Sequence, residues 1–336
     1  MDQVNHQTKL TASELANLWS QFTNDSLSRC IFLCFLNHVK DEEIKDVIQY
    51  ALELAETHLK KDKQFFLDDN YPIPKGFTDA DVTVEAPPLF TDIFMILYVQ
   101  IMAVHGMTRY AGALGNTMRE DQRKYLIECN SETMVLYDRA THVLLTKGII
   151  NKPPVLNNHQ QVEFVTKQSF LSGWFGKRRP INAVEISGVF LNLQKTTTKI
   201  VLELGFSQTA QSYEVRDYFE RARQVCQRHF EILSSMLKED NLHLPRTFGS
   251  EVTDATEPCF SDKLMLNHIV TLLSAAIGYY GEAMALCQRR DISAAYARMI
   301  TEIGILSEDG ANLLIEKGWL EQPPTAADHE ELSKHK

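Results

Sequence analysis

One segment of the chain occurs twice, 171 residues apart. Residues 41–77, DEEIKDVIQYALELAETHLKKDKQFFLDDNYPIPKGF, return without a gap at residues 212–248 as SYEVRDYFERARQVCQRHFEILSSMLKEDNLHLPRTF. His58 and His229 are among the identical residues in register. A self-match of this length indicates an internal duplication, and a chain of 336 residues agrees with about two domains. We therefore expect two similar halves.

Both halves show helical periodicity and equivalent helix starts. Thr11 with Glu14, and Asn182 with Glu185, predict capping boxes, in which the two side chains satisfy free backbone N–H groups at a helix start. Apolar residues and one histidine recur every seven positions along residues 44–65, which is typical of helix-bundle packing.

A long connection separates the second and third predicted helices of each half. Residues 71–90 contain four prolines and no helical period. A helix of about 28 residues is roughly 40 Å long, so a connection of this size can return along it and start the third helix at the same end as the second. The predicted fold is all-α, with two tandem ferritin-like four-helix bundles, each with a long crossover connection.

The expected domain organisation is a first bundle at 8–154, an ordered linker at 155–181, a second bundle at 182–324 and a polar tail at 325–336. The linker contains too many apolar residues for a free tether. We expect the side chains of Trp174 and Phe175 to be substantially buried, because burying two large aromatic rings is favourable.

Composition and charge narrow the classes of partner. A net charge of −10 disfavours nucleic-acid binding, which needs a basic face. The start, MDQVNHQTKL, lacks the pattern of a signal peptide, and the longest apolar runs are shorter than the roughly 18 residues of a membrane span. The six cysteines form no CxxC pair and are typical of reduced core thiols. We expect a cytoplasmic protein that binds neither nucleic acid nor membrane.

Several motifs resemble one known family over about residues 8–330. They are LTASELANLW, PIPKGFTDADV, PLFTD, KQSFLSGWFGKRRPINAVEI, SEVTDATEPCFSDKLM, RRDISAAYARMITEIG and ANLLIEKGWLEQPP. The chain resembles the duplicated proteins of endospore-forming bacteria known as domain of unknown function 3231. This resemblance implies two ferritin-like bundles, and some relatives are labelled as candidate spore coat proteins. It implies no reaction, ligand or site residue.

A di-iron site of the ordinary ferritin-like kind is not predicted. Such sites use Glu-x-x-His motifs, and no histidine of this chain follows a glutamate by three residues. A weaker candidate set lies at similar heights on the four helices of the first half and could bind Zn, Fe or Mn. Its members are Asp25, His58, His105 and Glu132.

The second half supports a simpler alternative. The equivalents of that set are Thr196, His229, Ala275 and Glu302. Only the histidine and the glutamate recur. Buried pairs, His58 with Glu132 and His229 with Glu302, would satisfy both polar groups and explain the recurrence without metal.

Three classes of function follow. The leading prediction is a non-enzymatic structural or interaction protein without a cofactor, associated with the spore or a stress response, for which homo-oligomers or spore-layer proteins are compatible partners. The alternative is a metal-binding protein or metal-dependent oxidoreductase that uses a site in the first bundle only. A bundle cavity for a small apolar ligand is a third class, which has no marker in the sequence.

Overall fold

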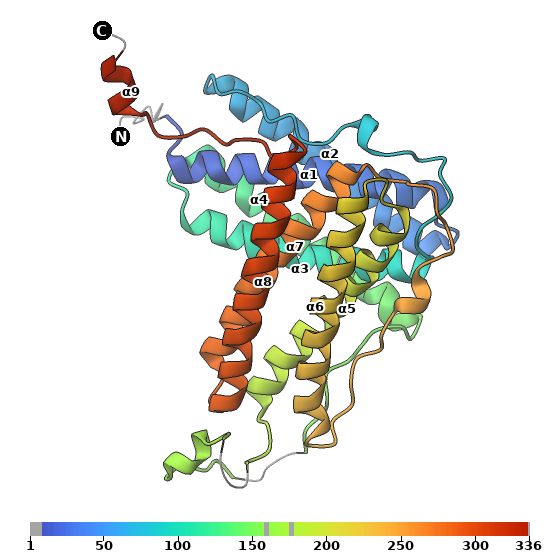
Figure 1. The fold of residues 1–336 in the computed structure, drawn as a ribbon, viewed down its shortest axis with the longest axis vertical. Helices are drawn as coiled ribbons and strands as arrows, with labels where there is room; N and C mark the ends of the chain where they lie inside the picture. Colours follow the sequence, from blue (N-terminus) through green and yellow to red (C-terminus); the bar gives the residue numbers. More distant parts are fainter. Residues whose placement is uncertain (1–8, 158–160, 175–177, 335–336) are drawn as a thin grey trace.

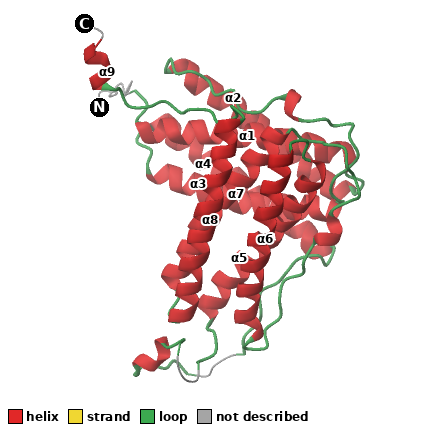
Figure 2. Cartoon of the chain, viewed as in Figure 1, coloured by secondary structure: helices red, strands yellow, loops and turns green. Residues whose placement is uncertain are grey.

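The computed structural model describes residues 9–157, 161–174 and 178–334. Within these ranges the regular secondary structure is helical (Figure 2), so the all-α prediction is confirmed. The first half contains α1 (Ala12–His38), α2 (Glu42–Asp68), α3 (Asp92–Gly115) and α4 (Glu120–Thr146). The second half contains α5 (Ala183–Thr209), α6 (Tyr213–Lys238), α7 (Asp262–Leu286) and α8 (Arg290–Glu316), and the short α9 (His329–Lys334) follows.

Both predicted capping boxes are present. Thr11 and Glu14 exchange side-chain and backbone hydrogen bonds at the start of α1, and Asn182 and Glu185 do so at the start of α5. In each half the same glutamate also accepts two backbone N–H groups from the residues just before the fourth helix (Met118 and Arg119; Gln288 and Arg289). One buried carboxylate therefore ties the first helix of each bundle to the start of its last helix.

The long crossover is also confirmed. Asp92, at the start of α3, accepts the N–H groups of Lys40 and Asp41 at the turn between α1 and α2. The third helix therefore starts where the second one starts. On its way back the connection runs along α1, where Asn37 donates a hydrogen bond to the carbonyl of Val84 at 2.6 Å.

The two crossovers pair with each other in antiparallel fashion. Thr83 N–H donates to the Cys259 carbonyl at 2.9 Å, and Thr253 N–H donates to the Leu89 carbonyl at 3.0 Å. These two bonds join equivalent positions of the two halves. A second equivalent pair of backbone bonds runs from Thr91 to Glu251 and from Ser261 to Asp81. The halves are thus related by a pseudo-twofold axis.

This axis passes between α3 and α7, which cross at the centre of the molecule (Figure 1). Tyr98 and His268 occupy the same position in the two repeats, and the Tyr98 hydroxyl lies 3.0 Å from His268 Nε2. Both side chains are buried. One hydrophobic core cluster continues through both halves, so the two bundles share a core.

The segment after each bundle's last helix adds a further contact between the halves. Glu321 accepts the backbone N–H groups of Lys75 and Gly76, and Asn151 accepts that of Arg246. Gly76 has a φ of 58°, a conformation that favours glycine. Each bundle therefore binds the crossover of the other.

α7 lies in the middle of this shared core. It is the one helix of the described chain that is long and apolar enough to cross a membrane by length and composition. Its side chains Leu264, Met265 and Ile269 are fully buried against other parts of the protein. About 39% of its most apolar 18-residue window is buried, so packing in the core accounts for part of the apolar character of α7.

The prediction for the linker aromatics is wrong for Trp174, whose side chain is 59% exposed; Phe175 lies outside the described residues. Farther upstream, Phe164 is 91% exposed. Burial needs an apolar surface opposite the linker, and the linker instead passes a charged end of the second bundle. There it is held mainly by polar contacts, and Phe170, half-buried, stacks under the guanidinium of Arg179 at 4.1 Å.

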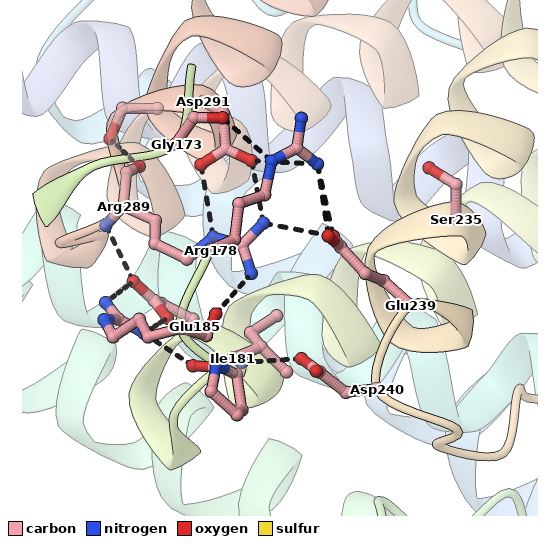
Figure 3. A network of polar contacts seen from close by, with 12 residues as sticks. Gly173, Arg178, Ile181, Glu185, Ser235, Glu239, Asp240, Arg289 and Asp291 are labelled. Atoms are coloured by element: carbon pink, nitrogen blue, oxygen red, sulfur yellow. Dashed lines mark hydrogen bonds and ion pairs between the residues drawn. The ribbon is translucent and has the colours of Figure 1, made fainter. Parts of the chain in front are cut away.

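Figure 3 shows that charged end of the second bundle. Arg289 is 1% exposed and forms ion pairs with Asp291 at 2.8 Å and Glu239 at 3.2 Å. Arg178, from the linker, reaches the same Glu239 carboxylate and also donates to the Gly173 carbonyl. The network fixes the linker to the second bundle through hydrogen bonds and charge.

The shared core predicts a test of how strongly the halves depend on each other. Phe90, on the first crossover, is 2% exposed and its ring lies 6.3 Å from that of Phe206 in the second half. We expect Phe90→Ala to lower the free energy of unfolding by about 3–5 kcal/mol, measured by urea denaturation. Leu67→Ala, at an exposed position, is the control and should change it by less than about 0.5 kcal/mol. Equal effects of the two substitutions would contradict a shared core at the crossovers.

Candidate functional site

The hydrophobic core of the first half is interrupted. A small cluster that includes Leu18, Phe22 and Tyr125 is separate from the main core that continues into the second half. Between the two clusters each helix carries polar residues, among them Asp25 on α1 and His58 on α2. The interruption marks the place where the structure departs from ordinary bundle packing.

A cavity of about 420 Å³ lies at this interruption. It is enclosed by all four helices of the first half, and α7 of the second half closes it on one side. Its walls are largely apolar and include Leu27, Phe32, Leu54, Val99, Met102 and Leu272. Thr108, Arg109 and Glu282 also line it and are exposed, so the cavity opens to solvent there. The site is a pocket with an apolar interior and a charged entrance.

Three polar side chains of the cavity wall, Asp25, His58 and Tyr110, meet here, and Glu132 lies behind them. His58 Nε2 lies 3.0 Å from Glu132 Oε2, as the predicted pair requires. His58 Nδ1 lies 3.3 Å from the Tyr110 hydroxyl and 3.5 Å from Asp25 Oδ2. Asp25 Oδ2 is buried and accepts no hydrogen bond in the described structure. Both ring nitrogens of His58 are therefore engaged, while Asp25 Oδ2 has an ion-pair contact with that ring but no hydrogen bond.

The second half repeats the pair in a different environment. His229 Nε2 lies 3.0 Å from Glu302 Oε2, and its Nδ1 lies 3.4 Å from the Tyr280 hydroxyl. Thr196 replaces Asp25, and its hydroxyl lies 3.4 Å from that of Tyr280. The His–Glu–Tyr arrangement is thus common to both bundles, and the carboxylate is particular to the first.

The two histidines have opposite charge states. Burial alone would lower the pKa of His58, but the adjacent Asp25 carboxylate and the Cys129 thiol raise that pKa to about 12. Burial, together with the charge of Lys199, lowers the pKa of His229 to about 4 even though Glu302 favours its charged form. At neutral pH the first half therefore holds an imidazolium and the second a neutral imidazole.

The second half has no cavity of comparable size at the equivalent place within the described residues. The space there is reduced to about 10 Å³. Lys195 and Lys199 occupy the positions of Asn24 and Ser28, and the Lys195 ammonium lies 3.5 Å from the centroid of the Tyr279 ring. Further wall positions also carry larger side chains in the second half, namely Leu273 for Ala103, Ala276 for Gly106, Tyr296 for Leu126 and Ile303 for Thr133.

These lysines lie in a buried polar cluster. Burial lowers the pKa of Lys195 to about 7, and it raises the pKa of Glu203 to about 8. The Cys226 thiol donates to Glu203 at 3.2 Å. In the second half the interior is filled by side chains that interact with each other, and α5 packs along α7 more closely than α1 packs along α3.

The four candidate metal ligands are not all brought together. Asp25, His58 and Glu132 are neighbours, but the ring of His105 packs on Tyr279, 5.1 Å between centroids. No group of three or more His, Cys, Asp or Glu side chains within the described ranges is arranged to hold a metal ion. Three of the four candidate ligands are therefore neighbours and His105 is turned to Tyr279, and the metal set stays a prediction.

Sequence reasoning missed two parts of the site. Tyr110 and Tyr280 recur in register next to the His–Glu pairs, and this recurrence could have identified them. The cavity itself had a weaker signal, in the smaller side chains of the first repeat at wall positions such as Ala103 and Gly106.

Substituting the residue beside each ring should change the charge states of His58 and His229. Asp25→Asn should lower the pKa of His58, and Thr196→Asp should raise that of His229, because each changes the carboxylate beside the ring. The pKa values are measured by NMR of histidine-labelled protein. Since the pKa of His229 is depressed in the folded state, the stability it contributes is present above about pH 6.5 and is lost as the pH falls towards 4. Unchanged pKa values in both variants would show that burial alone sets the two charge states.

Comparison with known proteins places the chain in a family. Residues 1–162 and 169–332 match the family described as "Protein of unknown function (DUF3231)". The comparison with curated proteins gives no match. Among solved structures, the chain is similar to a candidate spore coat protein from Bacillus halodurans C-125, with 16% sequence identity, a TM-score of 0.41, and coverage of 45% of this chain and 98% of that one. The chain belongs to the DUF3231 family and contains the family's domain twice.

Proposed function

We propose that this protein is a non-enzymatic binding protein. Its first bundle takes a small, largely apolar ligand, and its second bundle is a structural partner. The proposal states what the predicted interaction protein would bind. It also takes the order of helices, with one long crossover in each half, as ferritin-like, and it includes no metal centre.

The observation that carries the proposal is the difference between two otherwise equivalent interiors. The first half keeps a cavity of about 420 Å³, whereas the corresponding space in the second half is about 10 Å³. Ligand pockets in proteins typically measure about 300–1,000 Å³ and are mostly apolar with a few placed polar groups. The first cavity fits this description. The second half shows that side chains can fill the same space when the backbone is similar.

The second half takes part in the site even though its own interior is filled. Its helix α7 supplies Thr271, Leu272, Ala275 and Tyr279 to the cavity wall. The crossover pairing holds α7 in that position. A ligand in the cavity would therefore contact both halves and stabilise their association.

Association with the spore, and with spore-layer proteins or further copies of the chain, is part of the proposal that comes from the family resemblance. Such partners would bind the outer surface of the two-bundle unit. This role is compatible with a ligand site in the interior, because the two use different surfaces.

A fluorescent probe tests the ligand site. We expect the neutral apolar dye N-phenyl-1-naphthylamine to bind saturably, with one molecule per chain, and to increase in fluorescence. Ala103→Leu places a side chain in the cavity that the second half carries at the same position (Leu273). It should weaken dye binding at least tenfold without lowering the melting temperature.

Ala111→Leu provides the matched control. Ala111 lies on the same helix as Ala103, but its side chain is exposed and does not line the cavity. Its affinity for the dye should equal that of the wild type. Equal binding by the Ala103→Leu variant, or binding that does not saturate, would refute the proposed function.

A further inference from the structure

We propose that the ligand of the first bundle is an apolar amine, whose protonated nitrogen pairs with Asp25 while its hydrocarbon body fills the cavity. This inference rests on the proposed function and specifies the chemical class of its ligand. It follows from the unsatisfied carboxylate, from the balance of charges around the cavity, and from the side chains that fill the second half.

Asp25 has an incomplete set of hydrogen bonds. Its carboxylate lines the cavity, its side chain is 13% exposed, and its Oδ2 accepts no hydrogen bond in the described structure. A buried carboxylate oxygen without a donor is costly. The nearest cationic group is His58, at 3.5 Å, and that ring is shared with Glu132 at 3.0 Å. A ligand that brings its own N–H donors would satisfy Asp25.

Charged groups surround the cavity. The carboxylates of Asp25, Glu132 and Glu282 lie in or directly behind the cavity wall, and they face the cations His58 and Arg109. Because burial lowers the pKa of both His105 and His268, these two rings are neutral. In the interior the two carboxylates of Asp25 and Glu132 thus share one cation, His58, which favours a cationic ligand over an anion beside Asp25.

The second half shows which side chains fill such a space. There the interior is filled by Lys195 and Lys199, each an alkyl chain that ends in an amino group, and neither Nζ has a hydrogen-bond partner in the described structure. Their equivalents in the first half, Asn24 and Ser28, are short and line the open cavity. A free alkylamine in the first half would reproduce this filling, with Asp25 as the acceptor in place of the groups near Lys199.

The shape of the cavity limits the ligand further. The carboxylate lies on α1 in the interior, and the exposed lining residues Thr108, Arg109 and Glu282 lie on α3 and α7. The amine would therefore enter the cavity fully, with its apolar body against Leu54, Val99 and Leu136. A compact primary amine fits this requirement better than a long chain that extends into solvent.

Three probes of equal shape test the class of head group. Adamantan-1-amine, adamantan-1-ol and adamantane-1-carboxylate are titrated against the full-length protein, by calorimetry and by displacement of N-phenyl-1-naphthylamine. We expect the amine to bind at least tenfold more tightly than the alcohol, and the carboxylate to bind most weakly. Equal affinity of the amine and the alcohol, or tighter binding of the carboxylate, would overturn the inference.

Substitutions then locate the contact. Asp25→Asn should weaken binding of the amine at least tenfold and change that of the alcohol by less than twofold. Asp138→Asn, at an exposed aspartate of α4 outside the cavity, is the matched control and should leave both affinities unchanged. Loss of amine selectivity in the Asp138→Asn variant, or its full retention in the Asp25→Asn variant, would show that Asp25 does not hold the amine.

A third variant serves if Asp25→Asn fails to fold. Ser28→Lys introduces the lysine that the second half carries at this position, and it should abolish amine binding because its own ammonium occupies the site. Amine binding that persists in this folded variant would contradict the inference.

Failure of the inference is distinguishable from failure of the proposed function. In the first case the dye still binds and Ala103→Leu still weakens it, whereas in the second Ala103→Leu has no effect on the dye.

Discussion

The pairing of the two crossovers is the interaction on which the rest of the structure depends. Each crossover is an extended segment whose backbone groups find partners on the other half, through bonds such as Thr83 to Cys259 and Thr253 to Leu89. The accepting residues Leu89 and Cys259 are buried, and buried backbone groups need such partners, so the pairing stabilises both crossovers. The same pairing fixes α7 against the first bundle, where it closes the cavity.

The pseudo-twofold relation makes the differences between the halves informative. The helix order, the capping glutamates and the His–Glu–Tyr contacts are the same in both. Differences in side-chain size and charge extend into the interior, where Lys195 and Lys199 fill one bundle and a cavity remains in the other. This difference between similar backbones is the basis of the proposal that the first half binds a ligand and the second is structural.

The paired histidines show how a shared contact acquires a different chemistry. His58 and His229 both lie 3.0 Å from a glutamate, but a carboxylate beside the first ring and an ammonium group near the second favour opposite charge states. The residue beside each histidine, rather than the recurring His–Glu pair, therefore determines the charge state of that histidine.

The sequence by itself determined the duplication, the helices with their capping boxes, the long crossovers and the positions of the His–Glu pairs. These features depend on local hydrogen bonds and on periodicity, which neighbouring residues in the chain define. Only the tertiary structure decided the pairing of the crossovers, the exposure of Trp174, the placement of His105 on Tyr279, and the cavity beside Asp25. Each of these depends on which surfaces of distant segments meet, and on whether their side chains fill the space between them.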